Sequence, residues 1–470
     1  MHESSSTTAD RLTTRSELRL AIRREQSTVQ LRFESEFVES LPAHTPISMR
    51  ALQALGTTPT TTAYTFTERD VEVVTTTDGR TAQRREPLPS GRWLTPAQAS
   101  DSASAALHAG DKQFTLRFID PASGLEPITS TTSILERTTV EALGRTVPAV
   151  KWSMTADRYP GVASIEFVDE SARAIRSETR LGDLNLVVLL ADRDLATAPG
   201  DPPELLTSTL VTPGRPIARP RSTTSATFLV RTTQDQLPDL PTAGFQTAQR
   251  IDPRTVRIRV DLARAAPAPP GDVQDGAFRA ASAMIERDDP EVMALRYKVQ
   301  PAHTRPLPTM LAASRLRQLV HDQIRAKNLD VGFASAAQVA RTRTGDCTEH
   351  AVLLAALLRA AGIPSRVVSG LVYVEHPGRP GAPSSGVFGY HMWTQALIES
   401  DGPPRWIDLD ATLPGPSDFD AAHIALLTSS FADGAMTNDL VRLTPLIGTL
   451  RIDVEPADDA TPQDPRHNAP

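Results

Sequence analysis

The feature that most constrains the fold is a long succession of strand-like segments in the first part of the chain. Between Ser16 and about Ala198, apolar and polar residues alternate in one short segment after another, with turn residues between them. Alternation with a period of two places the apolar side chains on one face of a strand. Strands joined by short turns, such as Asp78-Gly79, favour antiparallel sheets with one covered face. A short helix is expected among them at residues 96–110.

Composition and pattern divide the chain into six segments. Proline and threonine are concentrated between the strand-rich part and the rest, which is typical of a linker. Beyond that linker, two further strands precede a part in which helices come first and strands follow. The expected segments are a disordered tail (1–15), a β-rich N-terminal domain (16–198), a Pro/Thr-rich linker (199–225), a strand and linker segment (226–289), a mixed domain of helices and strands (290–454) and a second disordered tail (455–470).

Bulk properties exclude several classes of function. A net charge of −7 gives no electrostatic basis for binding nucleic acid. A single cysteine excludes an intramolecular disulfide and any zinc or redox site built from several cysteines. No apolar run is long enough for a membrane span, and no cofactor or metal site is expected. Without an apolar leader the protein is expected to be cytoplasmic, or periplasmic or secreted if a leader has been removed. Oligomeric state stays open.

The one cysteine, Cys347, lies at the junction between a polar loop and an apolar run. Residues 351–361 are apolar on almost every side and are followed by Gly362 and Pro364. This pattern predicts a buried helix with Cys347 at its first turn, a glycine at its C-terminal end and a proline as its stop. A thiol at a helix N-terminus experiences the positive end of the helix dipole, which favours the thiolate form.

Two further residue types that acyl transfer requires follow Cys347 along the chain. His391 lies in GYHMW, and Asp408 and Asp410 lie in RWIDLDAT. A thiolate can attack a carbonyl, an imidazole can take and return the proton, and a carboxylate can orient the imidazole. Taken singly, each residue is more typical of a structural position: an inert core cysteine, a packed histidine or a strand-end aspartate. The combination favours chemistry.

Three blocks in the correct order resemble the bacterial transglutaminase-like superfamily. They are RTGDCTEHAVLLAALLRAAGIPSRVVSG (343–370), GYHMW (389–393) and WIDLDAT (406–412), and the resemblance runs over about 290–450. It implies an α+β fold, a papain-like transglutaminase core in which the Cys helix packs on an antiparallel sheet, preceded here by a mostly β N-terminal region. It also implies that Cys347 is the nucleophile, His391 the base and Asp410 the orienting carboxylate.

The match has two departures, Ala411 and the second aspartate Asp408, and leaves several neighbours of the site open. Many relatives have proline where this chain has Ala411, so the turn after Asp410 is less rigid while no chemical group is lost. Asp410 is preferred to Asp408 because its spacing from Trp406 and Thr412 fits the motif. The other notable residues, with their expected roles, are Glu349 and His350 as structural hydrogen-bonding groups, His423 as a packing residue or a support next to the site, Arg366 as a holder of the loop after the helix, and Tyr373 and Trp393 as either groove lining or core.

The resemblance predicts a thiol enzyme that forms an acyl-thioester at Cys347 from a peptide or glutamine carboxamide. Transfer to an amine would make it a transglutaminase, and transfer to water a protease or amidase. The expected partner is therefore a protein or peptide substrate. The alternative is a non-catalytic binding or scaffold protein that retains a transglutaminase-like domain, which the length of the β-rich N-terminal part motivates.

Overall fold

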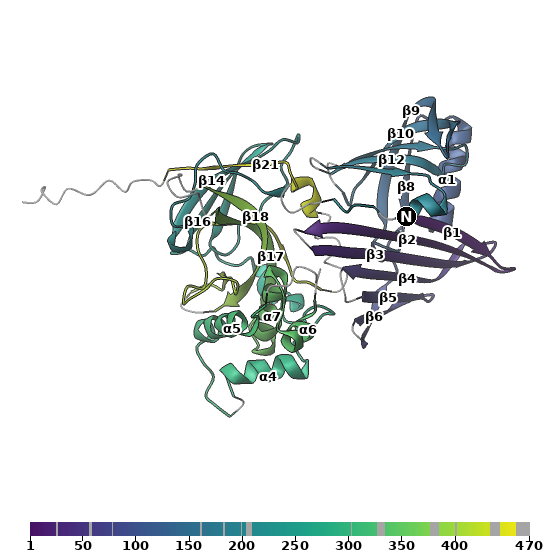
Figure 1. Cartoon of the computed structure of the whole chain (residues 1–470). Coiled ribbons are helices and arrows are strands. Elements are labelled where there is room, and N and C mark those ends of the chain that lie inside the picture. Colours follow the sequence, from purple (N-terminus) through teal and green to yellow (C-terminus); the bar gives the residue numbers. More distant parts are fainter. Residues whose placement is uncertain are drawn as a thin grey trace, which may run out of the picture.

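The protein forms two regions that lie side by side (Figure 1), the N-terminal region (residues 1–198) and the C-terminal region (residues 209–456). In the computed structural model both are built mainly of antiparallel sheets, and the helices gather at one end of the C-terminal region. The residues described are 1–24, 27–55, 59–77, 79–159, 162–181, 184–198, 200–203, 209–301, 303–326, 334–376, 385–399, 402–432 and 442–456.

The first sheet follows the chain strand by strand, each pairing antiparallel with the next. In β6, buried positions alternate with half-buried ones along its whole length, as its sequence predicts. The buried face packs against Ile119 and Leu125, which follow β8. The seven strands are β1 (His2–Thr7), β2 (Arg11–Arg24), β3 (Ser27–Ser40), β4 (Thr45–Leu55), β5 (Pro59–Phe66), β6 (Asp70–Thr77) and β7 (Arg80–Pro87).

The second sheet of the N-terminal region also follows chain order, and the one long helix of this region packs beside its first strand. That helix, α1 (Pro96–Ala109), begins after Thr95 in a reciprocal capping box with Gln98 and ends at Gly110, where φ is 77°. The remaining elements of the region are β8 (Gln113–Phe118), β9 (Ile128–Ala142), β10 (Arg145–Ala156), β11 (Ala163–Val168), β12 (Ala174–Leu181), β13 (Leu184–Leu189) and α2 (Arg193–Ala196).

The sequence does not locate every element of this region. In place of the disordered tail predicted for 1–15, the structure has β1 and the start of β2. The polar segment HESSST lacks hydrophobic alternation, and its backbone finds a partner in β2. Asp78 of the predicted hairpin turn, and the predicted tail 455–470 from residue 457 onward, lie outside the described residues.

A third sheet joins segments that are far apart in the chain. Its order is β15-β16-β14-β21, so a strand from the end of the C-terminal region completes a sheet begun about two hundred residues earlier. In the part predicted to be a linker, Val211 pairs with Phe388 and Ile217 is buried. The elements are η2 (Pro220–Ser222), β14 (Ser225–Thr232), β15 (Gln246–Asp252), β16 (Thr255–Asp261), α3 (Pro270–Gln274), η3 (Gly276–Phe278), η4 (Thr444–Leu446) and β21 (Leu450–Val454).

The fourth sheet, β19-β18-β17-β20, lies between that third sheet and a group of helices. Successive residues of β17 show this, because Val367 packs with the helices and Val368 packs toward the third sheet. The strands are β17 (Ser365–His376), β18 (Ser385–Ile398), β19 (Arg405–Leu409) and β20 (His423–Ser429). The helices are α4 (Pro290–Val299), α5 (Thr309–Gln323), α6 (Ala336–Thr342) and α7 (Cys347–Ala360).

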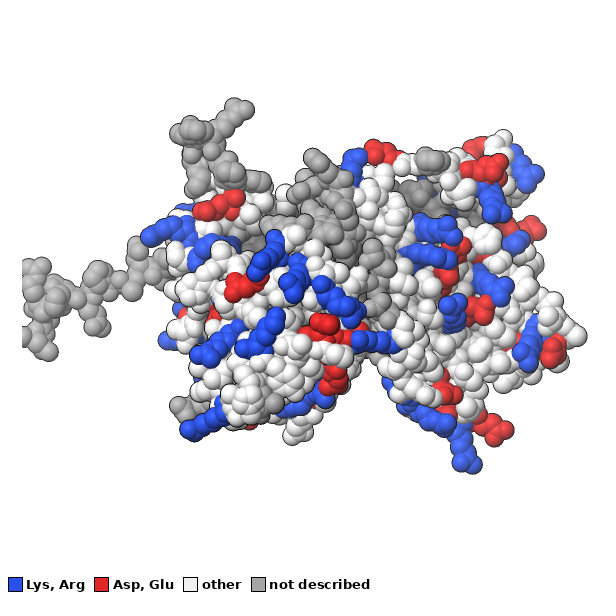
Figure 2. Space-filling model, turned by 60° about the horizontal axis from the view of Figure 1, so that its bottom comes forward, with Lys and Arg blue, Asp and Glu red and all other residues white. Residues whose placement is uncertain are grey.

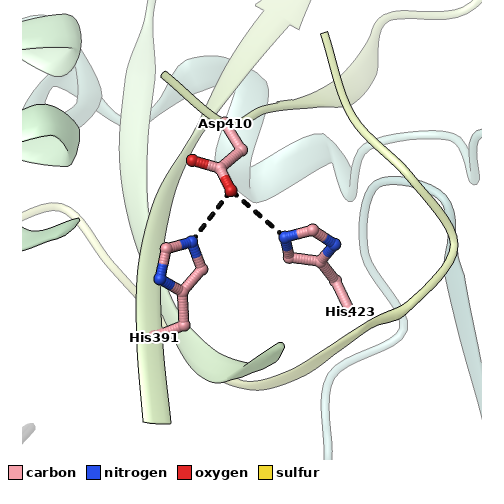
Figure 3. Close-up of side chains that lie close together, drawn as sticks. All are labelled: His391, Asp410 and His423. Carbon is pink, nitrogen blue, oxygen red and sulfur yellow. Dashed lines mark hydrogen bonds and ion pairs between the residues drawn. The ribbon is translucent and has the colours of Figure 1, made fainter. Parts of the chain in front are cut away.

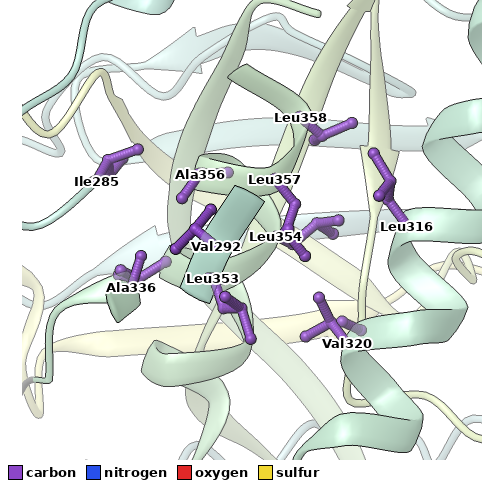
Figure 4. Packing of buried hydrophobic residues seen from close by; sticks show 14 of the residues in the cluster. Ile285, Val292, Leu316, Val320, Ala336, Leu353, Leu354, Ala356, Leu357 and Leu358 are labelled. Atoms are coloured by element: carbon purple, nitrogen blue, oxygen red, sulfur yellow. The ribbon is translucent and has the colours of Figure 1, made fainter. Parts of the chain in front are cut away.

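The predicted buried helix is α7, and it is the centre of the helical layer. Its leucines are surrounded by side chains from α4, α5 and α6 (Figure 4). It packs on β18 and β17, so the expected arrangement of a Cys helix on an antiparallel sheet is confirmed. The helix ends at Ala360, two residues before Gly362, whose φ of 80° lies in the left-handed region.

The two regions also meet through a salt bridge. Arg80, at the start of β7, pairs with Asp289 and Glu286, which precede α4. Figure 2 shows one face of the molecule, on which acidic side chains lie among the basic ones over both regions. Among the described helices, none has the length and apolar character needed to cross a membrane.

Candidate active site

Cys347 is the first residue of α7, and the hydrogen bonds around it fix the start of that helix. The Asp346 side chain accepts a hydrogen bond from the Thr348 N–H at 2.9 Å, and Glu349 accepts one from the Asp346 N–H at 2.8 Å. This reciprocal capping box satisfies N–H groups that a helix start leaves without partners. The thiol is half-buried, so it is held firmly while it stays in reach of a ligand.

Glu349 and His350 support this helix start, in line with the structural role expected of them. Glu349 is fully buried and also accepts a hydrogen bond from the Ala334 N–H at 3.0 Å. Burial, together with the charge of Asp346, raises the pKa of Glu349 to about 8. His350 Nδ1 lies 2.6 Å from the Asp346 carbonyl oxygen. Gly345 is required here because a Cβ at its position would lie 2.3 Å from the Cβ of Glu349.

His391 and Asp410 come from neighbouring strands and meet directly. His391 lies in β18, Asp410 follows the last residue of β19, and His391 Nε2 is 2.8 Å from Asp410 Oδ2 (Figure 3). The other carboxylate oxygen, Oδ1, accepts hydrogen bonds from the N–H and the hydroxyl of Thr412, both at 2.8 Å. With Nε2 engaged by Asp410, Nδ1 is the ring nitrogen that remains available to Cys347.

The charge state of His391 reflects both of these neighbours. Burial acts to lower the pKa of His391, but the charge of Asp410, the hydrogen bond to it, and the hydrogen bond and charge of Cys347 raise it to about 9. Burial acts to raise the pKa of Asp410, yet His391 and His423 hold it well below its usual range. The imidazole therefore keeps its second proton at neutral pH, and the carboxylate stays ionised.

A cavity of about 600 Å³ opens over these residues, and Cys347, His391 and Asp410 all line it. Its walls mix polar and apolar side chains, and it is open to solvent on one side. The other lining side chains include Arg221, His321, Arg325, His350, Val372, Tyr373, Val374 and Glu375. A site of this size and composition can hold several residues of a peptide.

Asp408 occupies a separate buried network. It accepts hydrogen bonds from Trp393 Nε1 at 2.8 Å, from Gln395 Nε2 at 2.7 Å and from the Phe245 N–H at 2.9 Å. Burial raises its pKa. The structure thus separates the two aspartates that the sequence placed together, and only Asp410 contacts His391.

The structure also tests the roles expected of Trp393, Tyr373 and Arg366. Trp393 belongs to the core, whereas Tyr373 is both buried and part of the cavity wall. The role expected of Arg366 is wrong, because its side chain does not hold the loop after α7. Arg366 lies in β17. Its guanidinium stacks 4.1 Å from the centre of the Trp406 ring and donates a hydrogen bond to Asp272 at 2.7 Å. An arginine buried in a strand has to be paired in this way.

The sequence does not predict the contacts that two further residues make at the site. His423 Nε2 lies 3.2 Å from Asp410 Oδ2, and Arg221 lines the cavity from a segment far upstream. The position of His423 in an apolar run gave a signal for burial but none for its partner. Arg221 has no motif around it, so only the fold reveals it.

His391, Asp410 and His423 are also the residue types that bind metal ions. Their nearest ligand atoms all lie within 4.8 Å of one another. In this arrangement both imidazoles hydrogen-bond the same carboxylate oxygen, at 2.8 and 3.2 Å, so an ion would have to displace both bonds.

Comparison with known proteins identifies this part of the chain. Residues 298–411 match the family model of the transglutaminase-like superfamily. No curated protein matches the chain. A solved candidate cysteine protease from Cytophaga hutchinsonii is 16% identical, with 49% of this chain and 81% of that chain covered and a TM-score of 0.26. The periplasmic domain of TgpA from Pseudomonas aeruginosa is 17% identical, with 43% and 93% covered and a TM-score of 0.25.

The same TgpA domain bound to ethylmercury is 18% identical, with 41% of this chain and 91% of that chain covered and a TM-score of 0.25. The family match includes Cys347 and His391 and continues through Asp410. Over residues 298–411 the chain is therefore similar to the transglutaminase-like superfamily.

Proposed function

We propose that the protein is a thiol acyltransferase or hydrolase in which Cys347, His391 and Asp410 form the catalytic triad. The observation that supports this most directly is the position of His391, whose ring hydrogen-bonds Asp410 and lines the same open cavity as Cys347. A nucleophile, a base and an orienting carboxylate in this order are the groups that acyl transfer requires.

In the first half-reaction, the Cys347 thiolate attacks the carbonyl carbon of a peptide or glutamine carboxamide. A carbon–sulfur bond forms, and the negative charge on the carbonyl oxygen faces the backbone N–H of Cys347 at the start of α7. When the carbon–nitrogen bond breaks, protonated His391 gives its proton to the leaving amine. The raised pKa of His391 suits this step because the proton is in place at neutral pH.

In the second half-reaction, neutral His391 takes a proton from the incoming amine or water, which attacks the acyl-thioester. The carbon–sulfur bond breaks and the thiolate and imidazolium are restored. Asp410 holds the ring through Nε2 during both steps, so that Nδ1 stays directed at the sulfur and the reacting nitrogen or oxygen. An amine acceptor would give transamidation, and water would give hydrolysis.

The test combines the full-length protein with a library of glutamine-containing peptides and a fluorescent primary amine, analysed by mass spectrometry. Amine incorporation would indicate a transglutaminase, and cleavage or deamidation a hydrolase. We expect Cys347→Ala to lower turnover about a thousandfold or more and His391→Ala to lower it about a hundredfold or more.

Glu136→Ala, an exposed change on β9, serves as the matched control and should retain full turnover. If the folded wild-type protein gives no product and no thioester at Cys347, the proposal is wrong and a binding or scaffold role is favoured.

A further inference from the structure

The carboxylate oxygen of Asp410 that bonds His391 also contacts a second histidine. His423 is the first residue of β20, and only 1% of it is exposed. Its Nε2 lies 3.2 Å from Asp410 Oδ2, the same oxygen that bonds His391 (Figure 3). Rings of Phe419 and Trp393 pack against it, with centroids 4.3 and 5.2 Å away, so the imidazole has one available orientation.

Both nitrogens of His423 face acceptors. While Nε2 faces Asp410, Nδ1 lies 2.9 Å from Asp420 Oδ1 and 3.1 Å from the Asp420 carbonyl oxygen. A neutral imidazole has one N–H and one acceptor nitrogen, so it would leave a nitrogen lone pair facing a carboxylate. Only the imidazolium, with two N–H groups, satisfies both sides. In agreement, the hydrogen bonds and charges of Asp410 and Asp420 outweigh burial and raise the pKa of His423 to about 9.

The network continues to the cavity wall through Asp420. Asp420 Oδ2 pairs with Arg221 Nη1 at 2.7 Å, and Arg221 also donates to the carbonyl oxygen of Tyr373. From Arg221 through Asp420, His423 and Asp410 to His391, the charges alternate in sign. Alternation of this kind allows Asp420, His423 and Asp410 to be buried together, because each of these three has an opposite charge on either side.

We propose that His423 is a positioning residue of the active site, a buried imidazolium that holds Asp410 against His391 and is itself held by Asp420 and Arg221. The inference rests on the proposed function, since it assigns His423 a role in the same reaction. Two consequences follow from the geometry. Donation from His423 fixes the direction of Oδ2, and its positive charge opposes the second proton on His391, which makes His391 a better acid toward the leaving group.

The first test measures the charge of His423 without any substrate. Nitrogen-15 histidine NMR of the full-length protein distinguishes protonated from bare ring nitrogens, and the signal lost in His423→Gln identifies the residue. We expect both nitrogens of His423 to carry protons at pH 7. We also expect His391 to titrate at higher pH in His423→Gln than in the wild type, because a neighbouring positive charge has gone. A single protonated nitrogen on His423 at pH 7 would overturn the proposal.

The second test measures positioning through the reactivity of Cys347. Because the chain has one cysteine, iodoacetamide labelling reports on this thiol alone. His423→Gln keeps a donor that can reach Asp410, whereas His423→Leu fills the space without one. Between pH 6 and 7 we expect the alkylation rate to fall about tenfold in His423→Leu and to stay within about threefold of wild type in His423→Gln.

Equal rates near that of the wild type in both variants would show that His423 serves packing alone, and equally low rates would show that the hydrogen-bond donor kept by His423→Gln does not position Asp410. His108→Gln, on the exposed side of α1, is the control and should match the wild type. The outcomes separate the two proposals: a wild-type Cys347 that alkylates no faster than a simple thiol refutes the proposed triad. The NMR experiment reports the charge of His423 whether or not the proposed triad is catalytic.

Discussion

The N-terminal and C-terminal regions bury different kinds of polar group. Among the described residues of the N-terminal region, the buried polar side chains are almost all serine and threonine, and Glu39 is the charged exception. The C-terminal region buries ionisable side chains repeatedly. They are Glu286, Asp289, Arg317, Glu349, Arg359, Arg366, Asp408, Asp410, Asp420 and His423.

This difference shows where the fold constrains geometry most tightly. A buried hydroxyl turns to reach a nearby acceptor and costs little to replace. A buried charge must have its partners at fixed distances, because leaving it unpaired costs several kcal/mol. Perturbed ionisable groups also gather at functional sites. In this molecule the buried charges and the candidate active site occupy the same region, whereas the sheets of the N-terminal region are held by apolar packing and strand pairing.

The largest expected effect comes from removing one of these buried charges. Arg366→Leu leaves Asp272 and Gln395 without their guanidinium partner, so we expect the free energy of unfolding to fall by about 3–5 kcal/mol. The matched change in the other region is Arg15→Leu, which removes an exposed pair with Glu36 and should cost less than about 1 kcal/mol. Urea denaturation followed by tryptophan fluorescence measures both. Similar losses for the two variants would contradict the contrast between the regions.

The second prediction concerns pH and applies to the C-terminal region. His391 and His423 have a pKa of about 9 in the folded protein, against about 6.5 in an unfolded chain. Because the folded value is the higher one, their stabilisation is complete below about pH 6.5 and is lost as pH rises through 9. The loss is on the order of 3 kcal/mol for an imidazole titrating alone, and less for each of two that share Asp410.

Urea denaturation at pH 6.5, 8 and 9.5 checks this dependence. His423→Gln should make the decrease shallower, since one of the two titrating groups is then absent. If the free energy of unfolding of the wild type stays constant or increases between pH 6.5 and 9.5, His391 and His423 are not protonated cations in the folded protein.

The smallest expected effect belongs to the N-terminal region. Thr62 and Thr75 face each other across β5 and β6, with their hydroxyl oxygens 3.4 Å apart. Replacing both by valine removes donor and acceptor together and keeps the shape, so we expect the free energy of unfolding to change by less than about 0.5 kcal/mol. The single change Thr75→Val is the comparison, because it leaves Thr62 without this partner. A loss above 2 kcal/mol for the double variant would show that the hydroxyls are structural.

The sequence predicts most strands of the N-terminal region because one face of each is covered. Hydrophobic alternation predicts β6 and β10. It does not predict β1, because the residues of β1 are polar throughout and its strand structure depends on pairing with β2. The strands β4, β5 and β9 also lack a sequence prediction. The threonine-rich stretches of β5 and β9 show little hydrophobic alternation, although threonine packs well on a half-buried sheet.

In the C-terminal region, the sequence predicts α7, the strand that carries His391 and the strand that Asp410 follows. It does not predict β20, because HIALLTS is apolar on both faces and a fully buried strand has no alternation. The choice of Asp410 over Asp408 followed from motif spacing, and the structure gives the physical basis, since each aspartate has its own buried donors. The contact between His423 and Asp410 depends on how β19 and β20 are placed, which local sequence does not encode.

The pairing of β21 with β14 has a consequence for synthesis on the ribosome. By the time residues 450–454 emerge, the Cys347 helix and the three other strands of their sheet have already been translated. Until then β14 presents an open edge, and the sheet that backs the candidate active site is one strand short. A nascent chain therefore completes this half of the molecule only after residues 450–454 have emerged, so the candidate active site is assembled well after the Cys347 helix itself has been made.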